Sequence, residues 1–226
     1  MTKERIRAVK KERITWEGGT VSAAWHQANG DALLALTHGA GGTMETPSLR
    51  SFAAAMAERG VDVVRFNLPY VEAGRKSPGP AKRDEACWAA VATHLRSRAR
   101  RLYLGGRSYG GRMASHAVAD GTRCNGLVFL AYPLHPPGDK SALRTAHLAR
   151  ITVPMLFLQG TRDAFADWAL LERAVAALPR ATLHRIENAD HAHAVRGRTV
   201  DDVMTELADV TCAWMRTSTP AARTRR

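Results

Sequence analysis

One serine in the sequence is flanked by glycines in a way that suits nucleophilic catalysis. Residues 106–110 read GRSYG and fit the pattern G-x-S-x-G, with Ser108 at its centre. The apolar run over 101–106 predicts a strand before the motif, and a helix is predicted after it, over 109–119. Such a strand-turn-helix elbow holds its serine in a strained conformation above the sheet edge, and side chains at the two glycine positions would collide with neighbouring backbone. A plain glycine turn is the alternative, but the context favours a nucleophile.

A serine hydroxyl needs a base and an orienting acid, and both types of residue follow later predicted strands. Asp163 comes after the apolar run 153–159, and His191 comes after the run 181–186. The carboxyl ends of parallel strands meet at one edge of a sheet, where binding sites form. The order serine, acid, histidine is the chain order of one known class of triad. The sequence therefore predicts Asp163 as the acid and His191 as the base.

Other acidic and histidine residues lie close to these two positions. We favour His191 over His193 because it stands directly after the short loop that follows the strand. Asp167 falls inside a predicted helix and is interpreted as a surface carboxylate, whereas Asp190 is interpreted as a brace of the histidine loop.

The glycine-rich loop that follows an early apolar run is suited to stabilise an oxyanion. A tetrahedral intermediate needs backbone N–H donors, and we predict Tyr109, the residue after the nucleophile, and Ala40 in the stretch HGAGG as those donors. We interpret His38 as a residue that braces this loop. A dinucleotide fingerprint would need glycine where Met44 stands. No metal-binding motif such as H-E-x-x-H occurs, so neither a cofactor nor a metal is expected.

The remaining patterns alternate between strands and helices. We predict two strands about the Gly18–Gly19 turn within 13–27, then strands in 32–42, 61–69, 101–106, 126–131, 153–159 and 181–186. Helices are predicted over 47–59, 83–99, 109–119, 165–177 and 199–216, with a glycine- and proline-rich loop over 71–81. Such alternation predicts an α/β fold, with a mostly parallel, doubly wound sheet and helices on both faces. We expect one domain over 1–216 that opens with a charged segment (1–12), followed by a disordered basic tail (217–226).

Composition excludes several classes of protein. The chain has 226 residues, 45% of them hydrophobic, and a formal net charge of +12. Basic residues are scattered and lack interleaved aromatic side chains, so nucleic-acid binding is not expected as the main function. The first residues lack the apolar core of a signal peptide, and no apolar run is long enough to cross a membrane. Three widely spaced cysteines indicate free thiols, and we expect a cytoplasmic protein.

Several stretches together resemble a known family. The stretches are HGAGG, VVRFNLPY, GGRSYGGRMAS, YPLHPPG, LFLQGTRDAF and ADHAH, and the resemblance covers residues 33 to about 195. They resemble small α/β-hydrolases of the dienelactone-hydrolase-like group, and within it the branch related to hydrolase-like subunits of a histone-acetyltransferase complex. The resemblance implies an α/β-hydrolase fold with little or no cap domain, and it marks Ser108, Asp163 and His191 as the triad. Dienelactone hydrolase itself uses a cysteine nucleophile, so its substrate is not carried over to this serine.

These observations predict a serine hydrolase that cleaves small or short-acyl carboxylic esters or thioesters through an acyl-enzyme. The segment 132–150 is short where larger hydrolases insert a lid, which favours an open site. Candidate pocket residues are Met44, Tyr70, Phe165 and Trp168. We expect a small-molecule ester or thioester as partner, no membrane partner, and a monomer or homodimer. The alternative is a non-catalytic interaction module that keeps the fold.

Overall fold

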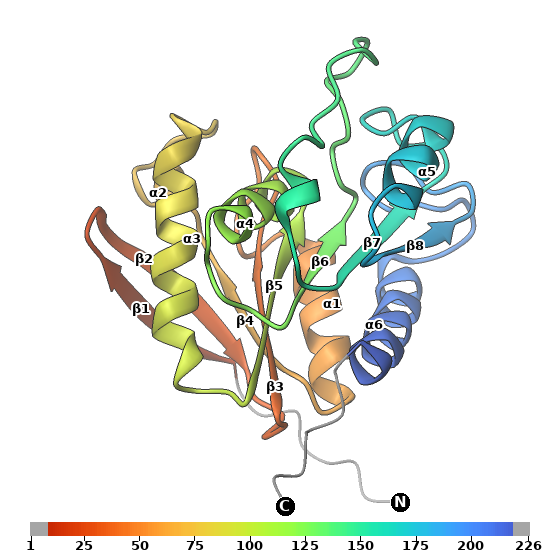
Figure 1. Cartoon of the computed structure of the whole chain (residues 1–226). Helices are drawn as coiled ribbons and strands as arrows, with labels where there is room; N and C mark the ends of the chain where they lie inside the picture. The colour runs from red at the N-terminus through yellow and green to blue at the C-terminus, as the bar shows by residue number, and fades with distance from the viewer. Residues whose placement is uncertain (1–8, 219–226) are drawn as a thin grey trace, which may run out of the picture.

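The computed structural model describes residues 9–218, and these residues build one eight-stranded sheet (Figure 1). The strand order is β1-β2-β4-β3-β5-β6-β7-β8. β1 pairs antiparallel with β2, and β2 pairs antiparallel with β4, while every pairing from β4 to β8 is parallel. The strands are β1 (Lys10–Trp16), β2 (Gly19–His26), β3 (Ala32–Thr37), β4 (Asp62–Phe66), β5 (Arg101–Arg107), β6 (Gly126–Leu130), β7 (Met155–Gly160) and β8 (Ala181–Ile186).

Helices cover both faces of this sheet. α1 (Pro47–Glu58) and α6 (Val200–Thr217) pack side by side on one face, while α3 (Ala81–Arg96), α4 (Tyr109–Ala119) and α5 (Trp168–Ala176) lie on the other (Figure 1). Two hydrophobic clusters follow from this arrangement, one on each face. The predicted α/β architecture, with its mostly parallel, doubly wound sheet, is confirmed.

Burial explains why the central strands read as unbroken apolar runs. Every residue of β3, β6 and β7 is buried, as expected where helices cover both faces of a parallel sheet. Helix boundaries follow local signals: α1 has Pro47 in its first turn and is followed by Gly60 at a φ of 82°. α6 begins with a capping box in which Thr199 and Asp202 satisfy each other's backbone N–H groups.

Several predicted boundaries differ from those observed, and three of the differences have a clear structural meaning. β1 begins at Lys10, so the end of the charged segment 1–12 is a strand of the sheet. α5 begins at Trp168 rather than at 165, because the side chain of Asp167 accepts a hydrogen bond from the Leu170 N–H and caps the helix. A short helix, α2 (Pro69–Glu72), takes up the first residues of the loop expected over 71–81. Residues 219–226 of the predicted tail lie outside the described part.

The connection between β6 and β7 carries no cap domain. Between these two strands the structure forms one three-residue 3-10 helix, η1 (Leu148–Arg150), at the end of an irregular segment that rises above the sheet (Figure 1). The expectation of little or no cap is confirmed. Within residues 9–218, no helix combines the length and apolar character that crossing a bilayer requires.

Candidate active site

Ser108 lies on a sharp turn between β5 and α4. Its backbone has φ 50° and ψ −117°, a conformation rarely adopted by a residue with a side chain. The two glycines of the motif permit close approach of the chain. A Cβ at position 106 would lie 2.5 Å from the carbonyl oxygen of Thr37, and one at position 110 would lie 2.4 Å from that of His38. The turn therefore requires glycine at both positions.

One hydrogen-bonded chain joins the serine to a histidine and a carboxylate. His191 Nε2 lies 2.8 Å from Ser108 Oγ, and His191 Nδ1 lies 2.7 Å from Asp163 Oδ2. The Asp163 side chain is fully buried, whereas 17% of the His191 side chain is exposed. These residues follow β5, β7 and β8, whose carboxyl ends meet at one sheet edge. The structure thus brings together all three residues that the sequence singled out.

Two donors that sequence reasoning missed fix the carboxylate of Asp163. Gln159 Nε2 donates to Asp163 Oδ2 over 2.6 Å, and the Phe165 N–H donates to Oδ1 over 2.7 Å. Gln159 is fully buried in β7. A lone amide inside an otherwise apolar strand was a usable signal, because a buried polar side chain requires a hydrogen-bond partner.

Arg107 and Phe165 hold the imidazole in place. Arg107 Nη2 donates to the backbone oxygen of His191 over 3.0 Å. Burial lowers the pKa of Arg107, and Asp163 and Asp190 partly offset this effect. The Phe165 ring lies 4.3 Å from the His191 ring, centroid to centroid, at an angle of 32°. Arg107 occupies a variable position of the glycine motif, so the motif gave no signal for this contact.

The competing residues of the histidine loop have structural partners. His193 is buried with Nε2 3.1 Å from the oxygen of Leu158, and burial lowers the pKa of His193 to about 4. Asp190 Oδ1 accepts from the N–H groups of Ala192 and Ala194 at 2.8 and 2.9 Å, so it braces the loop. Asp167 pairs with Lys140, but it caps α5 instead of lying inside a helix as interpreted from the sequence.

A tight turn after β3 lies beside the serine. The Gly42 N–H donates to the Gly39 oxygen over 3.1 Å, which leaves the N–H of Ala40 outside the turn's own bond. His38 is fully buried beneath this turn: its Nδ1 lies 2.9 Å from the Gly39 oxygen, and its Nε2 accepts from Leu68. Tyr109 is the first residue of α4, so its N–H has no acceptor within the helix.

The four candidate pocket residues have different surroundings. Met44 and Tyr70 are buried, and the Tyr70 hydroxyl donates to the Gly39 oxygen over 3.3 Å. Phe165 lies against His191, as described above. The Trp168 ring lies beneath Arg185 of β8, 5.3 Å from the guanidinium carbon. Contact of any of the four with substrate remains a prediction.

Comparison with known families identifies the chain. Residues 30–216 match the family described as an alpha/beta hydrolase domain. The chain belongs to this family. The match includes Ser108, Asp163 and His191, together with the glycine turn after β3 and the connection without a lid.

Solved structures of several hydrolases share this fold. An α/β serine hydrolase without a lid from Xanthomonas campestris superposes with a TM-score of 0.72 at 21% identity, covering 97% of this chain and 100% of that one. A dienelactone hydrolase from Anabaena variabilis gives 0.75 at 15% identity, covering 94% and 99%. An esterase from Pyrococcus furiosus gives 0.74 at 16% identity, covering 93% of each chain. The alpha/beta hydrolase domain of this chain thus has the serine hydrolase fold, with esterases among its structural neighbours.

Proposed function

We propose that the protein is a serine hydrolase that cleaves small or short-acyl carboxylic esters or thioesters. The observation that carries the proposal is the continuous chain from Ser108 Oγ through His191 to Asp163, with contacts of 2.8 and 2.7 Å. A serine hydroxyl is a weak nucleophile without a base in such contact.

In this mechanism His191 Nε2 takes the hydroxyl proton while Ser108 Oγ attacks the acyl carbon. Asp163 holds the imidazole in the tautomer that leaves Nε2 free to accept, and it stabilises the imidazolium that forms. The contacts from Gln159 and Phe165 keep the carboxylate of Asp163 in place for this task.

The tetrahedral intermediate carries its negative charge on the former carbonyl oxygen. In the proposal the N–H groups of Ala40 and Tyr109 bind this oxygen. His191 then gives its proton to the leaving alcohol or thiol, and the acyl group stays on Ser108. Water repeats the sequence, with His191 again as base, and releases the carboxylic acid.

The connection between β6 and β7 supports the proposal of a small substrate. This segment carries only a single 3-10 turn where a lid would cover a long acyl chain. Long acyl chains need an enclosing apolar channel, so short acyl groups fit the proposal better.

A fluorophosphonate probe, combined with p-nitrophenyl acetate hydrolysis, tests this proposal. We expect the folded wild-type protein to be labelled at Ser108 and to hydrolyse the ester, and Ser108→Ala to lose both properties. Ser115→Ala is the matched control, because Ser115 is also hydrogen-bonded to a histidine but lies fully buried in α4. A folded wild-type protein that is neither labelled nor active would overturn the proposal and favour a non-catalytic module.

A further inference from the structure

A pocket of about 430 Å³ lies between α4 and the end of the connection that leads to β7. Arg112 and His116 line it from α4, and Arg144, His147 and Arg150 line it from the connection. In Figure 1 this end of the connection passes in front of α4. Among the residues that line the pocket there is no carboxylate.

Two of the three arginines that line this pocket lack an ion-pair partner among the described residues. In the part of the chain from 9 to 218, neither Arg112 nor Arg144 forms an ion pair with a carboxylate. Arg112 Nε is buried without a hydrogen-bond partner there. Arg150 pairs with Asp120 over 3.0 Å, but Lys82 shares that carboxylate at 3.1 Å. Burial and the neighbouring Arg112 both lower the pKa of Arg144. The positive charges are therefore crowded, and those of Arg112 and Arg144 have no carboxylate partner in the described part of the chain.

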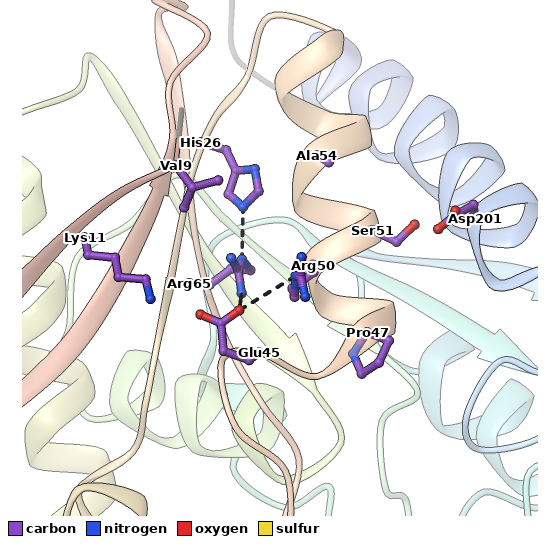
Figure 2. A pocket seen from close by; sticks show the side chains of 10 residues that line it. All are labelled: Val9, Lys11, His26, Glu45, Pro47, Arg50, Ser51, Ala54, Arg65 and Asp201. Atoms are coloured by element: carbon purple, nitrogen blue, oxygen red, sulfur yellow. Dashed lines mark hydrogen bonds and ion pairs between the residues drawn. The ribbon is translucent and has the colours of Figure 1, made fainter. Parts of the chain in front are cut away.

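Figure 2 shows a second cavity that also contains arginines, but there carboxylates lie beside them. It measures about 590 Å³ and lies between α1 and the edge of the sheet. There Glu45 lies 3.5 Å from the guanidinium of Arg65 and 3.7 Å from that of Arg50, and Asp201 also lines the cavity. The second cavity thus supplies its own counter-charges, whereas the pocket beside α4 does not.

The histidines of the pocket beside α4 stack on each other and form one wall of it. The rings of His116 and His147 are stacked at 3.6 Å, with an angle of 14° between their planes. Ser115 Oγ holds His147 Nε2 at 2.7 Å. Burial, together with His116 and the nearby arginines, lowers the pKa of His147 to about 3. A preformed wall reduces the ordering cost of binding.

We propose that this pocket binds the phosphate group of a small molecule. Guanidinium groups recognise phosphate through paired, charge-assisted hydrogen bonds, and an anion would relieve the repulsion between Arg112 and Arg144. The site is separate from the reacting serine but close to it along α4: the backbone N–H of Arg112 donates to the backbone carbonyl oxygen of Ser108 over 3.0 Å, so the two residues lie about one helical turn apart. The phosphate can belong to a substrate of the proposed hydrolase or to a separate ligand.

Calorimetric titration of the whole protein with inorganic pyrophosphate tests the site directly, at constant ionic strength. We expect saturable binding to the wild-type protein and a loss of affinity of about tenfold or more in Arg112→Gln and in Arg144→Gln. Arg50→Gln is the matched control, because it removes an arginine from the other cavity, and it should bind pyrophosphate as the wild type does. Arg144→Glu supplies Arg112 with a carboxylate partner, so it should fold stably and bind no pyrophosphate.

Absence of binding by the folded wild-type protein would overturn the proposal, as would equal affinity in all four variants. The binding measurement uses no turnover, so its result stands whether or not the protein hydrolyses esters. Inhibition assays then identify the source of the phosphate. Competition between pyrophosphate and a neutral p-nitrophenyl ester supports a phosphorylated substrate, whereas binding without competition supports a separate ligand.

Discussion

Residues 9–218 contain two serine–histidine hydrogen bonds of nearly equal length in very different surroundings. Ser108 Oγ lies 2.8 Å from His191 Nε2, and Ser115 Oγ lies 2.7 Å from His147 Nε2. Ser108 stands on a strained turn, while Ser115 lies in the middle of α4 and is fully buried. The length of the bond therefore does not distinguish a candidate nucleophile from a structural hydroxyl.

The difference lies in what surrounds each pair. The imidazole of His191 has Asp163 on its far nitrogen at 2.7 Å, which holds Nε2 towards the Ser108 hydroxyl. Burial lowers the pKa of His147, and the stacked ring of His116 and the nearby arginines lower it further. Ser115 Oγ also donates to the Arg112 oxygen over 2.7 Å, so its only proton is already used. His191, with a carboxylate on its far nitrogen, is therefore suited to act as a catalytic base, whereas His147, which lies among arginines, is not.

Removing the Asp163 carboxylate that supports the Ser108–His191 pair should have the largest effect on catalysis. Asp163→Asn places an amide where His191 needs an acceptor, so the imidazole adopts the wrong tautomer, and kcat should fall about 10³–10⁴-fold. Steady-state hydrolysis of a p-nitrophenyl ester measures this. Asp167→Asn is the matched control, because asparagine also caps helices well. Equal activity in both variants would contradict the assigned role of Asp163.

Removing the Arg107 contact that positions His191 should have a smaller effect on catalysis. Arg107→Met keeps most of the side chain's apolar stem but removes the hydrogen bond to the His191 oxygen. Misplacement of a catalytic group by a fraction of an ångström slows the chemical step, so we expect kcat to fall about 10- to 100-fold. KM should change much less. Unchanged kcat with a raised KM would show instead that Arg107 contacts substrate.

Breaking the second pair should affect stability and leave turnover unchanged. Ser115→Ala removes a buried hydroxyl with two hydrogen bonds and leaves His147 Nε2 unpaired, so the free energy of unfolding should fall by about 1–3 kcal/mol. Urea denaturation measures this change. Ester hydrolysis at a temperature where the variant is folded should stay within about twofold of wild type, since the surrounding site is unaltered. A large loss of kcat would mean that the two pairs are coupled.

Replacing His147 should have the smallest effect, and this effect is a change in how the free energy of unfolding depends on pH. The folded imidazole stays neutral down to about pH 3, whereas the unfolded one gains a proton below its ordinary pKa. The unfolded state therefore binds more protons in this range, and stability is lost as the pH falls from about 6.5 towards 3. His147→Gln keeps a donor for Ser115 but does not titrate. Between pH 6 and pH 5 the free energy of unfolding should fall in both proteins, and the fall should be about 1 kcal/mol smaller in the variant than in the wild type. Equal losses would contradict the lowered pKa.

The sequence by itself determined the elements that carry the site and the order in which they occur. Apolar runs such as 153–159 mark buried strands because both faces of a parallel sheet are covered. The glycines around Ser108 predict close approach, since a side chain there would collide with neighbouring backbone. Asp163 and His191 were identifiable because each follows a strand whose end must lie at the same edge.

Only the tertiary structure decided which groups support that site and which positive charges remain unpaired. Gln159, Arg107 and Phe165 act on residues that are distant in the sequence or lie in loops, where no periodic pattern reveals a partner. The start of α5 depended on one hydrogen bond from the Leu170 N–H to Asp167, which composition does not show. The pocket beside α4 combines residues from a helix and from a connection about thirty positions later. Charge compensation depends on distances in space, so the sequence alone shows a net charge of +12 but not where it is concentrated.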